Sequence, residues 1–396
     1  MWSSRKAILP RRWFAFVKSQ ENSGFVAHIK KLNEKTIQNQ FPLTDPAEII
    51  NNAAGKKYIS KLDLKSGYYQ FKMAKESQKY TAFRYGKSQL LEWTRMPFGI
   101  SNSSRTCQRA LVRLLNTARE YASNLLDDII IYSEDWESHL KHVDDILSRL
   151  EQHGLTVNCA KCEFCLPKME VLGYTLEGGK IKASDDKIKA ITNLKPPTTK
   201  TQVRQILGLT GYYRKLIPAY GHKVHCLTEL LKKSQPIKVK WEAHHQAALD
   251  SIKNWLTTEP VLVPADPNKD YILQTDCSSV SAGAILMQLD DDGNEHVIAY
   301  ASRKLLPRER NYSTIERELL CIVWSLQHFE YYVYGKKVKV YSDHKGLQWL
   351  KTMATHNPRL QRWSLILERY DVTTTYKKAE LIKNSDALSR LERSDE

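Results

Sequence analysis

The sequence predicts an α+β protein with more than one domain, the last of which is a compact α/β domain. Three observations predict this fold class. Between residues 58 and 183, β-forming stretches alternate with amphipathic helical ones. After residue 268, three strand patterns precede a long helix and another strand, the element order of an α/β domain. Proline-containing stretches at 195–200 and 259–270 separate these parts, and 396 residues are enough for two or three cores.

The first predicted elements are a strand and a helix. Residues 58–73, YISKLDLKSGYYQFKM, alternate polar and apolar residues and predict a strand with a turn at Ser66-Gly67. Residues 105–122, RTCQRALVRLLNTAREYA, carry apolar residues at helical spacing and predict a helix.

The next three elements complete the first half. SNLLDDIIIYS, residues 123–133, predicts a strand, a turn and a second strand. ESHLKHVDDILSRLEQHG predicts an amphipathic helix that ends at Gly154, with Asp144-Asp145 on its solvated face. VLGYTLEGGKI predicts a short hairpin that turns at Gly178-Gly179.

Helical periodicity resumes at residues 201–217 and 245–259. In the last domain, three strands are predicted by YILQTDCSS, SAGAILMQLD and EHVIAYASRKL. A long helix over RELLCIVWSLQHFEYYVYG, the strand KVKVYSDHK and further helical segments follow. Trp349, Trp363 and Tyr370 are predicted to be core aromatics rather than platforms for stacked bases.

The charge and the cysteine count restrict the class of protein. The formal net charge of +16 favours a polyanionic partner, of which nucleic acid is the commonest. No apolar run approaches the roughly 20 residues that span a bilayer, so no membrane partner is expected. Seven cysteines and no secretory signal favour a reducing compartment, cytoplasmic or nuclear. The first twenty residues are basic and contain no acid, which fits either a transit peptide or the start of a longer domain.

The stretch CAKCEFC places Cys159, Cys162 and Cys165 at ligand-like spacing. No convincing fourth ligand is near, and an apolar strand follows. A zinc protein is therefore an alternative that would require a stoichiometric bound metal.

Asp127 and Asp128 lie side by side within the apolar run LLDDIII. Ionised carboxylates are costly to desolvate unless a cation or strong donors compensate them. Either the pair is the turn of a plain hairpin, where Asp is common, or it holds a metal ion.

Other acids occur at the ends of predicted elements. Asp63 follows an apolar strand, and a sheet can bring it to Asp127 and Asp128; three such carboxylates would hold two divalent cations that activate a 3′-hydroxyl and stabilise the transferring phosphate. Hard Mg²⁺ prefers such oxygen ligands. The last domain offers a second set, suited to activating water against a phosphodiester: Asp276, Glu318, Asp343 and Asp386. From spacing alone, any single acid of this second set fits a surface residue better than a metal ligand.

The blocks around these acids resemble a known family. In order along the chain they are LDLKSGYYQ, KYTAF, MPFGISNS, LLDDIIIYS, LGY, QILGLTGYYRKLI, TDCSSVSAGAIL, YASRKL, NYSTIERELL, YSDHKGLQWL and NSDALSR. The first six resemble reverse transcriptases of gypsy-class LTR retrotransposons, and the last five resemble the ribonuclease H domain that follows in those polyproteins. Together they extend from about residue 29 to 391.

The resemblance implies a right-hand polymerase followed by an α/β ribonuclease H-like domain. The implied divisions are partial fingers over 1–57, a palm with an inserted fingers segment over 58–192, thumb and connection over 193–267, and ribonuclease H over 268–396. The implied metal ion is Mg²⁺, with Mn²⁺ as a substitute, two in each active site. The implied partners are an RNA template, a DNA primer, the RNA–DNA hybrid and deoxynucleoside triphosphates.

The resemblance also implies residue roles. Metal-binding acids of the polymerase fall on Asp63, Asp127 and Asp128, and those of the ribonuclease on the four acids of the last domain. Tyr68 falls where a ring excludes a 2′-hydroxyl, and Lys161 where a lysine protonates departing pyrophosphate; a core tyrosine and a surface lysine are the alternatives. Residues beside the nucleotide are Met96, Pro97, Phe98 and Gly99, and those on the turn that holds the primer end are Leu172, Gly173 and Tyr174.

The chain departs from the family pattern at three positions. Leu125 replaces a tyrosine that supports the primer end, Gly24 replaces an arginine that contacts the triphosphate, and His28 replaces an aspartate. Loss of a guanidinium that neutralises phosphate could cost a few kcal/mol. The Pro-Gly turn that usually precedes the last ribonuclease aspartate is also missing.

Two functional hypotheses follow. The first is an RNA-directed DNA polymerase with ribonuclease H activity, which acts in the cytoplasm, for example inside virus-like particles, or in the nucleus. The alternative is a truncated, polymerase-inactive relic that binds nucleic acid and keeps at most its ribonuclease activity. In either case, a basic track that holds duplex phosphates is expected along Lys187, Lys189, Lys195, Lys200, Arg204, Arg214 and Lys215. The resemblance implies that the helix that carries Arg204 lies along the minor groove.

Overall fold

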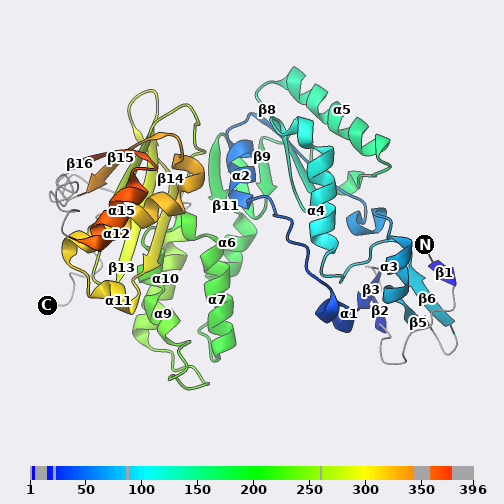
Figure 1. Cartoon of the computed structure of the whole chain (residues 1–396), viewed down its shortest axis with the longest axis horizontal. Helices are drawn as coiled ribbons and strands as arrows, with labels where there is room; N and C mark the ends of the chain where they lie inside the picture. Colours follow the sequence, from blue (N-terminus) through cyan, green and yellow to red (C-terminus); the bar gives the residue numbers. More distant parts are fainter. Residues whose placement is uncertain are drawn as a thin grey trace. The chain divides into compact units, whose positions relative to one another are not determined.

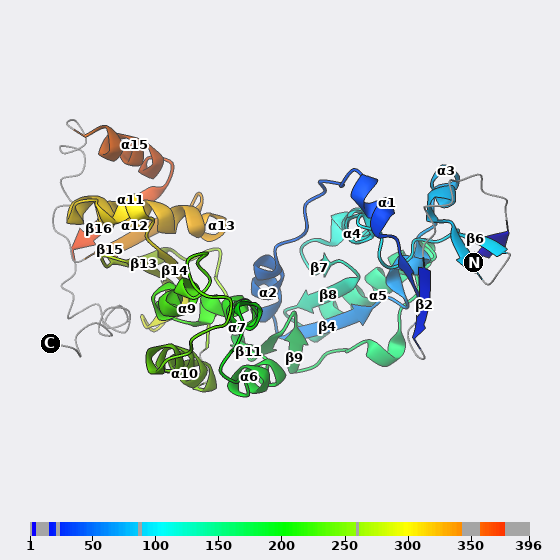
Figure 2. The same ribbon diagram turned by 90° about the horizontal axis from the view of Figure 1, so that it is seen from below.

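The computed structural model describes residues 2–4, 16–20, 24–85, 89–258, 261–342 and 357–376. The chain forms two compact units, Met1–Met169 and Glu170–Glu396 (Figures 1 and 2). The division falls within strand β9 (Lys168–Val171), upstream of the boundary expected at 195–200. No described helix is both long and apolar enough to cross a bilayer.

The first unit is built on an antiparallel sheet in the strand order β4-β8-β7 (Figure 2). Its strands are β4 (Tyr58–Asp63), β7 (Ala122–Leu125) and β8 (Asp128–Ser133). Ile129, Ile130 and Ile131 are all buried, so β8 packs on both faces, which explains its continuous apolar run. The predicted strand, turn and strand at LLDD are confirmed.

Three helices pack against this sheet: α2 (Pro46–Ala54), α4 (Ser103–Leu114) and α5 (Trp136–Gln152). The shared core includes Leu62, Leu111, Ile129, Ile146 and Leu150. The Asp135 side chain caps α5 by accepting from the Ser138 amide, and Gly154, at φ +67°, follows its end as predicted.

Helix α4 ends eight residues before the predicted end at residue 122. A 3₁₀ turn, η3 (Asn116–Ala118), follows it, and the chain then enters β7 at Ala122. Pairing of Ala122 with Ile131 of β8 explains the difference, because that strand contact outweighs the local helical pattern.

The remaining elements of the first unit are short. Strands are β1 (Trp2–Ser4), β2 (Phe16–Gln20), β3 (Gly24–His28), β5 (Phe83–Tyr85) and β6 (Gln89–Trp93). Helical turns are α1 (Lys30–Lys35), η1 (Gly67–Gln70), α3 (Lys75–Gln78), η2 (Lys79–Thr81) and η4 (Cys159–Lys161). Phe83 and Trp93 form a small separate core with Ile29.

A buried network of hydrogen bonds connects α5 to the β4-β8-β7 sheet. His139 is fully buried, with its Nε2 2.8 Å from Ser60 Oγ and its Nδ1 2.9 Å from Ser133 Oγ. Ser133 Oγ also lies 2.8 Å from His142 Nδ1. Burial, and then the neighbouring His142, lowers the pKa of His139 below 6.5.

This burial predicts acid sensitivity. The unfolded chain binds the His139 proton more readily than the folded chain does, so this contribution to stability is complete above about pH 6.5 and decreases as the pH falls toward the lower folded pKa. We expect His139→Gln, which can still hydrogen-bond, to flatten the decrease in urea midpoint between about pH 7 and pH 5. His153→Gln, at an exposed position after α5, is the control. Equal slopes in wild type and His139→Gln would contradict the prediction.

The second unit begins with a three-stranded sheet in the order β11-β10-β9. β10 (Tyr174–Glu177) and β11 (Lys180–Ala183) form the hairpin predicted from the sequence, with φ of +56° at Gly178 and +73° at Gly179. The following helical elements are α6 (Asp185–Thr192), α7 (Lys200–Tyr212), η5 (Arg214–Leu216), α8 (Tyr220–Lys223), α9 (His225–Glu229) and α10 (Ala243–Thr257). Helix α7 starts at a capping box between Thr199 and Gln202.

The last part of the chain forms a five-stranded mixed sheet in the order β14-β13-β12-β15-β16. The strands are β12 (Tyr271–Cys277), β13 (Ser281–Leu289), β14 (Glu295–Lys304), β15 (Lys337–Ser342) and β16 (Asp371–Tyr376). β12 to β14 are antiparallel neighbours, while β12, β15 and β16 are parallel. The predicted strands and the further strand are confirmed, whereas the predicted long helix over 317–335 is divided at Phe329 into a helix over Thr314–His328 and a short one over Glu330–Val333.

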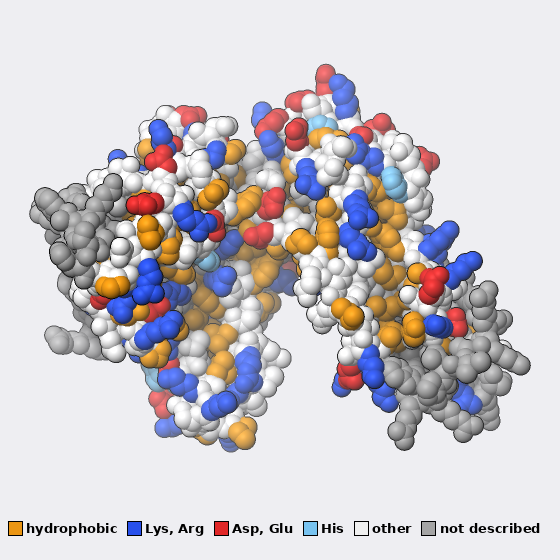
Figure 3. Space-filling view, in the orientation of Figure 1, with side chains coloured by type: hydrophobic (Ala, Val, Ile, Leu, Met, Phe, Trp, Pro, Cys, Tyr) orange, Lys and Arg blue, Asp and Glu red, His pale blue; other side chains and the backbone are white. Residues whose placement is uncertain are grey.

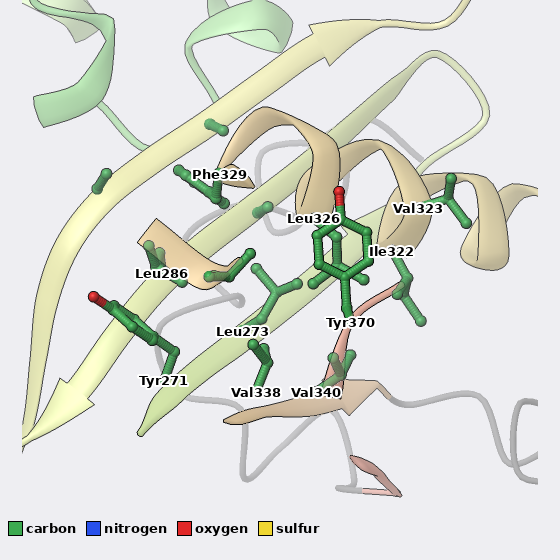
Figure 4. Packing of buried hydrophobic residues seen from close by; sticks show 14 of the residues in the cluster. Tyr271, Leu273, Leu286, Ile322, Val323, Leu326, Phe329, Val338, Val340 and Tyr370 are labelled. Carbon is green, nitrogen blue, oxygen red and sulfur yellow. The ribbon is translucent and has the colours of Figure 1, made fainter. Parts of the chain in front are cut away.

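Helix α12 (Thr314–His328) covers one face of this sheet (Figure 4). Its Ile322, Val323 and Leu326 pack with side chains of β12 and β15, and Tyr370 closes the same core. The other helices here are α11 (Pro307–Arg310), α13 (Glu330–Val333) and α15 (Pro358–Leu367). Trp363 packs against this core and Tyr370 is buried in it, as predicted for both, whereas Trp349 lies outside the described residues.

Strand β16 corrects the expectation that only helical segments follow β15. DVTTTY pairs in parallel with β15 from Asp371 to Tyr376. The threonines are strand formers, but the stretch has neither a clear apolar alternation nor a turn signal, so its place depends on the neighbouring strand.

Candidate active sites

The ends of β4 and β8 bring the first set of acids together. Asp63 is the direct cross-strand partner of Asp128, and Leu125 of β7 faces Asp128 from the other side. Lys61 Nζ lies 3.7 Å from Asp128 Oδ2. Burial raises the pKa of the Asp128 carboxyl; the Lys61 ammonium lowers it, and the carboxylates of Asp127 and Asp63 raise it. Three carboxylates that repel one another therefore lie close together at one end of the strands of this sheet.

Asp127 occupies the turn and faces the segment after β4. Ser66 adopts a left-handed conformation at φ +52°, which confirms the predicted turn and leads into η1. A Cβ at Gly67 would lie 3.0 Å from Asp127 Cβ and 3.1 Å from its Oδ2, so any larger residue would require the Asp127 side chain to shift by a few tenths of an ångström. Burial, then the nearby Asp127 carboxylate and Cys107, raises the pKa of Tyr68 to about 12.

A buried glutamine, which the sequence reasoning missed, holds the turn. Gln108 of α4 is fully buried, and its Oε1 accepts a 2.6 Å hydrogen bond from the Leu126 amide. Its Nε2 donates to Asn124 O at 3.2 Å and to Thr44 Oγ1 at 2.8 Å. Leu126 has φ +58°, which is costly for a leucine, so these bonds stabilise a strained turn. The available signal was a glutamine on the apolar face of a predicted helix.

We therefore expect Gln108→Leu to slow nucleotide addition by about 100-fold, because a loosened turn misplaces two carboxylates. The unsatisfied Leu126 amide should also cost about 1–3 kcal/mol of stability. Gln108→Glu keeps the acceptor for Leu126 but loses both donated bonds, so it should be intermediate. The measurement is kcat against KM for the nucleotide; a change in KM alone would contradict a positioning role.

Aromatic rings form the wall beside Asp127. The Tyr68 and Phe98 rings lie 5.0 Å apart, and Tyr69 contacts Phe98 at 5.3 Å. Gly99 has φ +100°, and its carbonyl accepts from Asn33 Nδ2 at 2.7 Å. Pro97 O accepts from Ser103 Oγ at 3.2 Å, which anchors this loop to α4. The structure thus brings the predicted MPFG loop, from Met96, against Tyr68.

Lys161 ends η4 and its side chain is exposed. The segment is anchored to β4, because the Asn158 amide donates to Asp63 O at 2.8 Å. The cysteines around it do not form a metal site: among the described residues, the group whose ligand atoms all lie within 4.8 Å is Glu242, His244 and His245. The zinc alternative at CAKCEFC therefore has no support.

That group lies at the start of α10, and local contacts already involve its atoms. The Glu242 amide donates to His245 Nδ1 at 3.1 Å, and Lys240 Nζ lies 3.1 Å from Glu242 Oε1. The same 4.8 Å criterion also shows that the three aspartates are spread more widely than a cage for one ion. Their hard oxygen atoms nevertheless suit Mg²⁺ ions that are shared with phosphate oxygens.

In the second unit, the turn Leu172-Gly173 between β9 and β10 is clamped by two tyrosines. Leu172 and Gly173 have φ of +51° and +76°. Tyr212 OH donates to Leu172 O, and Tyr213 OH donates to Gly173 O at 2.7 Å. Tyr174 OH donates in turn to Tyr212 O at 3.0 Å. The end of α7 therefore fixes the predicted primer-end turn.

Two of the four acids in the second set are described. Asp276 lies near the end of β12, opposite Gly283, and Glu318 lies on α12 with only 5% of its surface exposed. Cys321, one turn after Glu318, places its Sγ 3.4 Å from Asp276 O, so the two acids flank one contact between strand and helix. Asp343 and Asp386 lie outside the described residues.

Basic side chains occur in both units. In the expected track, Lys187, Lys189, Lys195, Arg204 and Arg214 are exposed and Lys215 is half-buried, whereas Lys200 Nζ donates to the carbonyls of Lys232 and Gln235. A second basic feature was not predicted: Arg105, Arg109 and Arg113 recur every four residues along α4, and Figure 3 shows Lys and Arg side chains in a line over that helix. Their helical spacing was the signal in the sequence.

Comparisons with known proteins agree with this arrangement. Residues 21–176 match the family described as reverse transcriptase (RNA-dependent DNA polymerase), and residues 266–370 match the RNase H-like domain found in reverse transcriptase. The chain is 35% identical over 367 residues to the retrovirus-related Pol polyprotein from transposon 297 of Drosophila melanogaster, covering 92% of this chain and 34% of that protein. It is 32% identical over 382 residues to the transposon Tf2-3 polyprotein of Schizosaccharomyces pombe, covering 95% and 28%. The chain thus spans about a third of the length of these curated relatives.

Solved structures show the same fold. The foamy viral protease-reverse transcriptase dRH in complex with double-stranded DNA superposes with a TM-score of 0.84 at 22% identity, covering 96% of this chain and 67% of that one. The same viral protein with an RNA/DNA hybrid gives 0.79 over 96% and 51%. The predicted fold class, a right-hand polymerase followed by an α/β ribonuclease H-like domain, is confirmed.

Proposed function

The chain carries a reverse transcriptase domain followed by an RNase H-like domain, as retrotransposon Pol polyproteins do. On this premise we propose that the chain is an RNA-directed DNA polymerase that also cleaves the RNA of RNA–DNA hybrids. We assign it to a gypsy-class LTR element. The observation that carries the proposal is the pairing of Asp63 with Asp128 beside Asp127 and the Tyr68 ring.

Asp63, Asp127 and Asp128 would hold two Mg²⁺ ions, which Mn²⁺ can replace. Ions held there would supply activation of the primer 3′-hydroxyl and neutralisation of charge on the transferring phosphate and the departing pyrophosphate. The residues of the chain do the remaining work by orientation. Gln108 keeps the turn in place, and Lys61 neutralises part of the charge on Asp128.

The pocket wall selects the nucleotide. The ring of Tyr68, held against Phe98, is proposed to occupy the space that a 2′-hydroxyl would need. Lys161 is proposed to donate a proton to the departing pyrophosphate. Leu172, Gly173 and Tyr174, clamped to α7, are proposed to hold the primer end.

In the last domain, Asp276 and Glu318, together with Asp343 and Asp386, are proposed to orient water against an RNA phosphodiester. The partners are an RNA template, a DNA primer and their hybrid, with deoxynucleoside triphosphates as substrates. The net charge of +16 and the exposed basic side chains of both units support binding through phosphates. The foamy viral relatives solved with double-stranded DNA and with RNA/DNA hybrid support the same partners.

The test is extension of a DNA primer on an RNA template with Mg²⁺, alongside cleavage of a labelled hybrid. We expect both activities in the wild type and loss of extension alone in Asp127→Asn. Cleavage without extension would favour the relic hypothesis, which Gly24, His28 and Leu125 motivate. Restoring tyrosine with Leu125→Tyr is then the informative variant, because Leu125 directly faces Asp128.

A further inference from the structure

Two thiols lie at the contact between β12 and α12, each close to one of the proposed ribonuclease acids. Cys277 follows Asp276 on β12, and Cys321 lies one turn after Glu318 on α12. Both are free thiols in this structure, and Cys277 packs against the buried cluster that contains Cys321.

The position of the inner thiol is fixed by the backbone of the sheet. Cys321 Sγ lies 3.4 Å from Asp276 O and 3.3 Å from Gly283 O, the carbonyls of a cross-strand pair. Cys277 and Cys321 also belong to one packed cluster with Ala282 and Leu320. The strand and the helix therefore pack together at the place where the two cysteines lie, and a disulfide would require only that their sulfurs come within bonding distance.

The two thiols differ in access. Cys321 is fully buried, whereas Cys277 is only half-buried. A small oxidant can thus reach Cys277 first, and Cys321 is in place to resolve the product, as in thiol pairs that respond to oxidants.

We propose that Cys277 and Cys321 are an oxidisable pair whose disulfide closes the ribonuclease site. This proposal rests on the proposed ribonuclease function. With a peroxide, the Cys277 sulfur attacks one peroxide oxygen, which gives a sulfenic acid and one water when the oxidant is hydrogen peroxide. The Cys321 sulfur then attacks the sulfenic sulfur, the S–S bond forms and a second water leaves. Two thiols are oxidised and one peroxide is reduced to two waters.

The bond would change the spacing of the acids. It draws the two sulfurs to bonding distance, and each sulfur moves with the segment that carries Asp276 or Glu318. A misplacement of about 1 Å in a catalytic group can cost about 100-fold in rate. The polymerase acids lie in the other unit, so the new bond does not cross-link the segments that carry them.

The experiment treats the full chain with hydrogen peroxide, then quenches it and divides it. One half is digested without reductant for peptide mapping, and the other is assayed for hybrid cleavage and for primer extension. We expect a Cys277–Cys321 linked peptide, a loss of cleavage of at least about tenfold, extension within about twofold, and recovery with dithiothreitol. Cys321→Ser should keep cleavage in the reduced state and resist reversible inactivation.

Cys159→Ser is the matched control, since Cys159 is exposed and lies in the other unit; it should behave as the wild type. The proposal is overturned if no linked peptide forms while Cys159 oxidises, or if the linked protein cleaves at the reduced rate. It is also overturned if Cys321→Ser loses cleavage to peroxide as reversibly as the wild type. Failure of the reduced protein to cleave any hybrid would instead reject the ribonuclease function, and the peptide map would still decide whether the pair oxidises.

Discussion

Asp128→Asn is expected to reduce primer extension by about 1,000-fold or more while leaving hybrid cleavage within about twofold of wild type. Asn keeps the size of the side chain but removes a charged ligand from the edge where three carboxylates meet. The fold should tolerate the change, because the lost carboxylate is half-buried and repelled by Asp63 and Asp127. Single-turnover extension with Mg²⁺ is the measurement, and a urea unfolding curve checks the fold.

Asp144→Asn is the control for this variant. Asp144 is an exposed carboxylate on α5, so its loss should change neither activity. Equal extension by Asp128→Asn and wild type would remove the polymerase assignment. Parallel losses of extension and cleavage would point to misfolding instead of a lost ligand.

Glu318→Gln is expected to give the opposite separation, with hybrid cleavage reduced by about 1,000-fold and extension retained. Glu318 is buried on α12, which packs on the strand β12 that carries Asp276, and it belongs to no part of the first unit. Gln fills the same space, so the core around Leu319 and Ile322 should remain packed. Cleavage of an end-labelled hybrid under single-turnover conditions is the measurement.

Glu330→Gln is the matched control for the second variant. Glu330 lies on the neighbouring α13, is partly exposed and pairs with Arg369 at 3.3 Å, so little change is expected. If Glu318→Gln cleaves at the wild-type rate, Glu318 does not belong to the set of ribonuclease acids.

The sequence was most informative where one interaction dominates. β8 was recognisable because a strand that is buried on both faces needs an unbroken apolar run, and Ile129 to Ile131 provide it. The hairpin at Gly178-Gly179 was recognisable because two positive φ angles favour glycine. The sequence also predicted that Asp63 lies near the Asp127-Asp128 turn, because the ends of neighbouring strands in one sheet lie side by side.

Features that depend on distant partners were not predictable in the same way. β16 is a strand because β15 offers an edge, and α4 ends early because Ala122 pairs with Ile131. Gln108 is 18 residues from Leu126 in the sequence, and no local pattern shows that its amide supports that turn. The roles of Asp343 and Asp386 remain sequence-based predictions, because both lie outside the described residues.

The cross-strand partnership of Asp63 and Asp128 has a consequence for how damage to such genes should be assessed. Neighbouring side chains of a strand project to opposite sides, so one extra residue within β4 would turn Asp63 away from Asp128. The amino-acid sequence would still contain all three aspartates. The presence of the three aspartates in the sequence would then suggest an active polymerase although the site could not form. Insertions and deletions between positions 58 and 63 should therefore identify gene copies without polymerase activity better than substitutions there do.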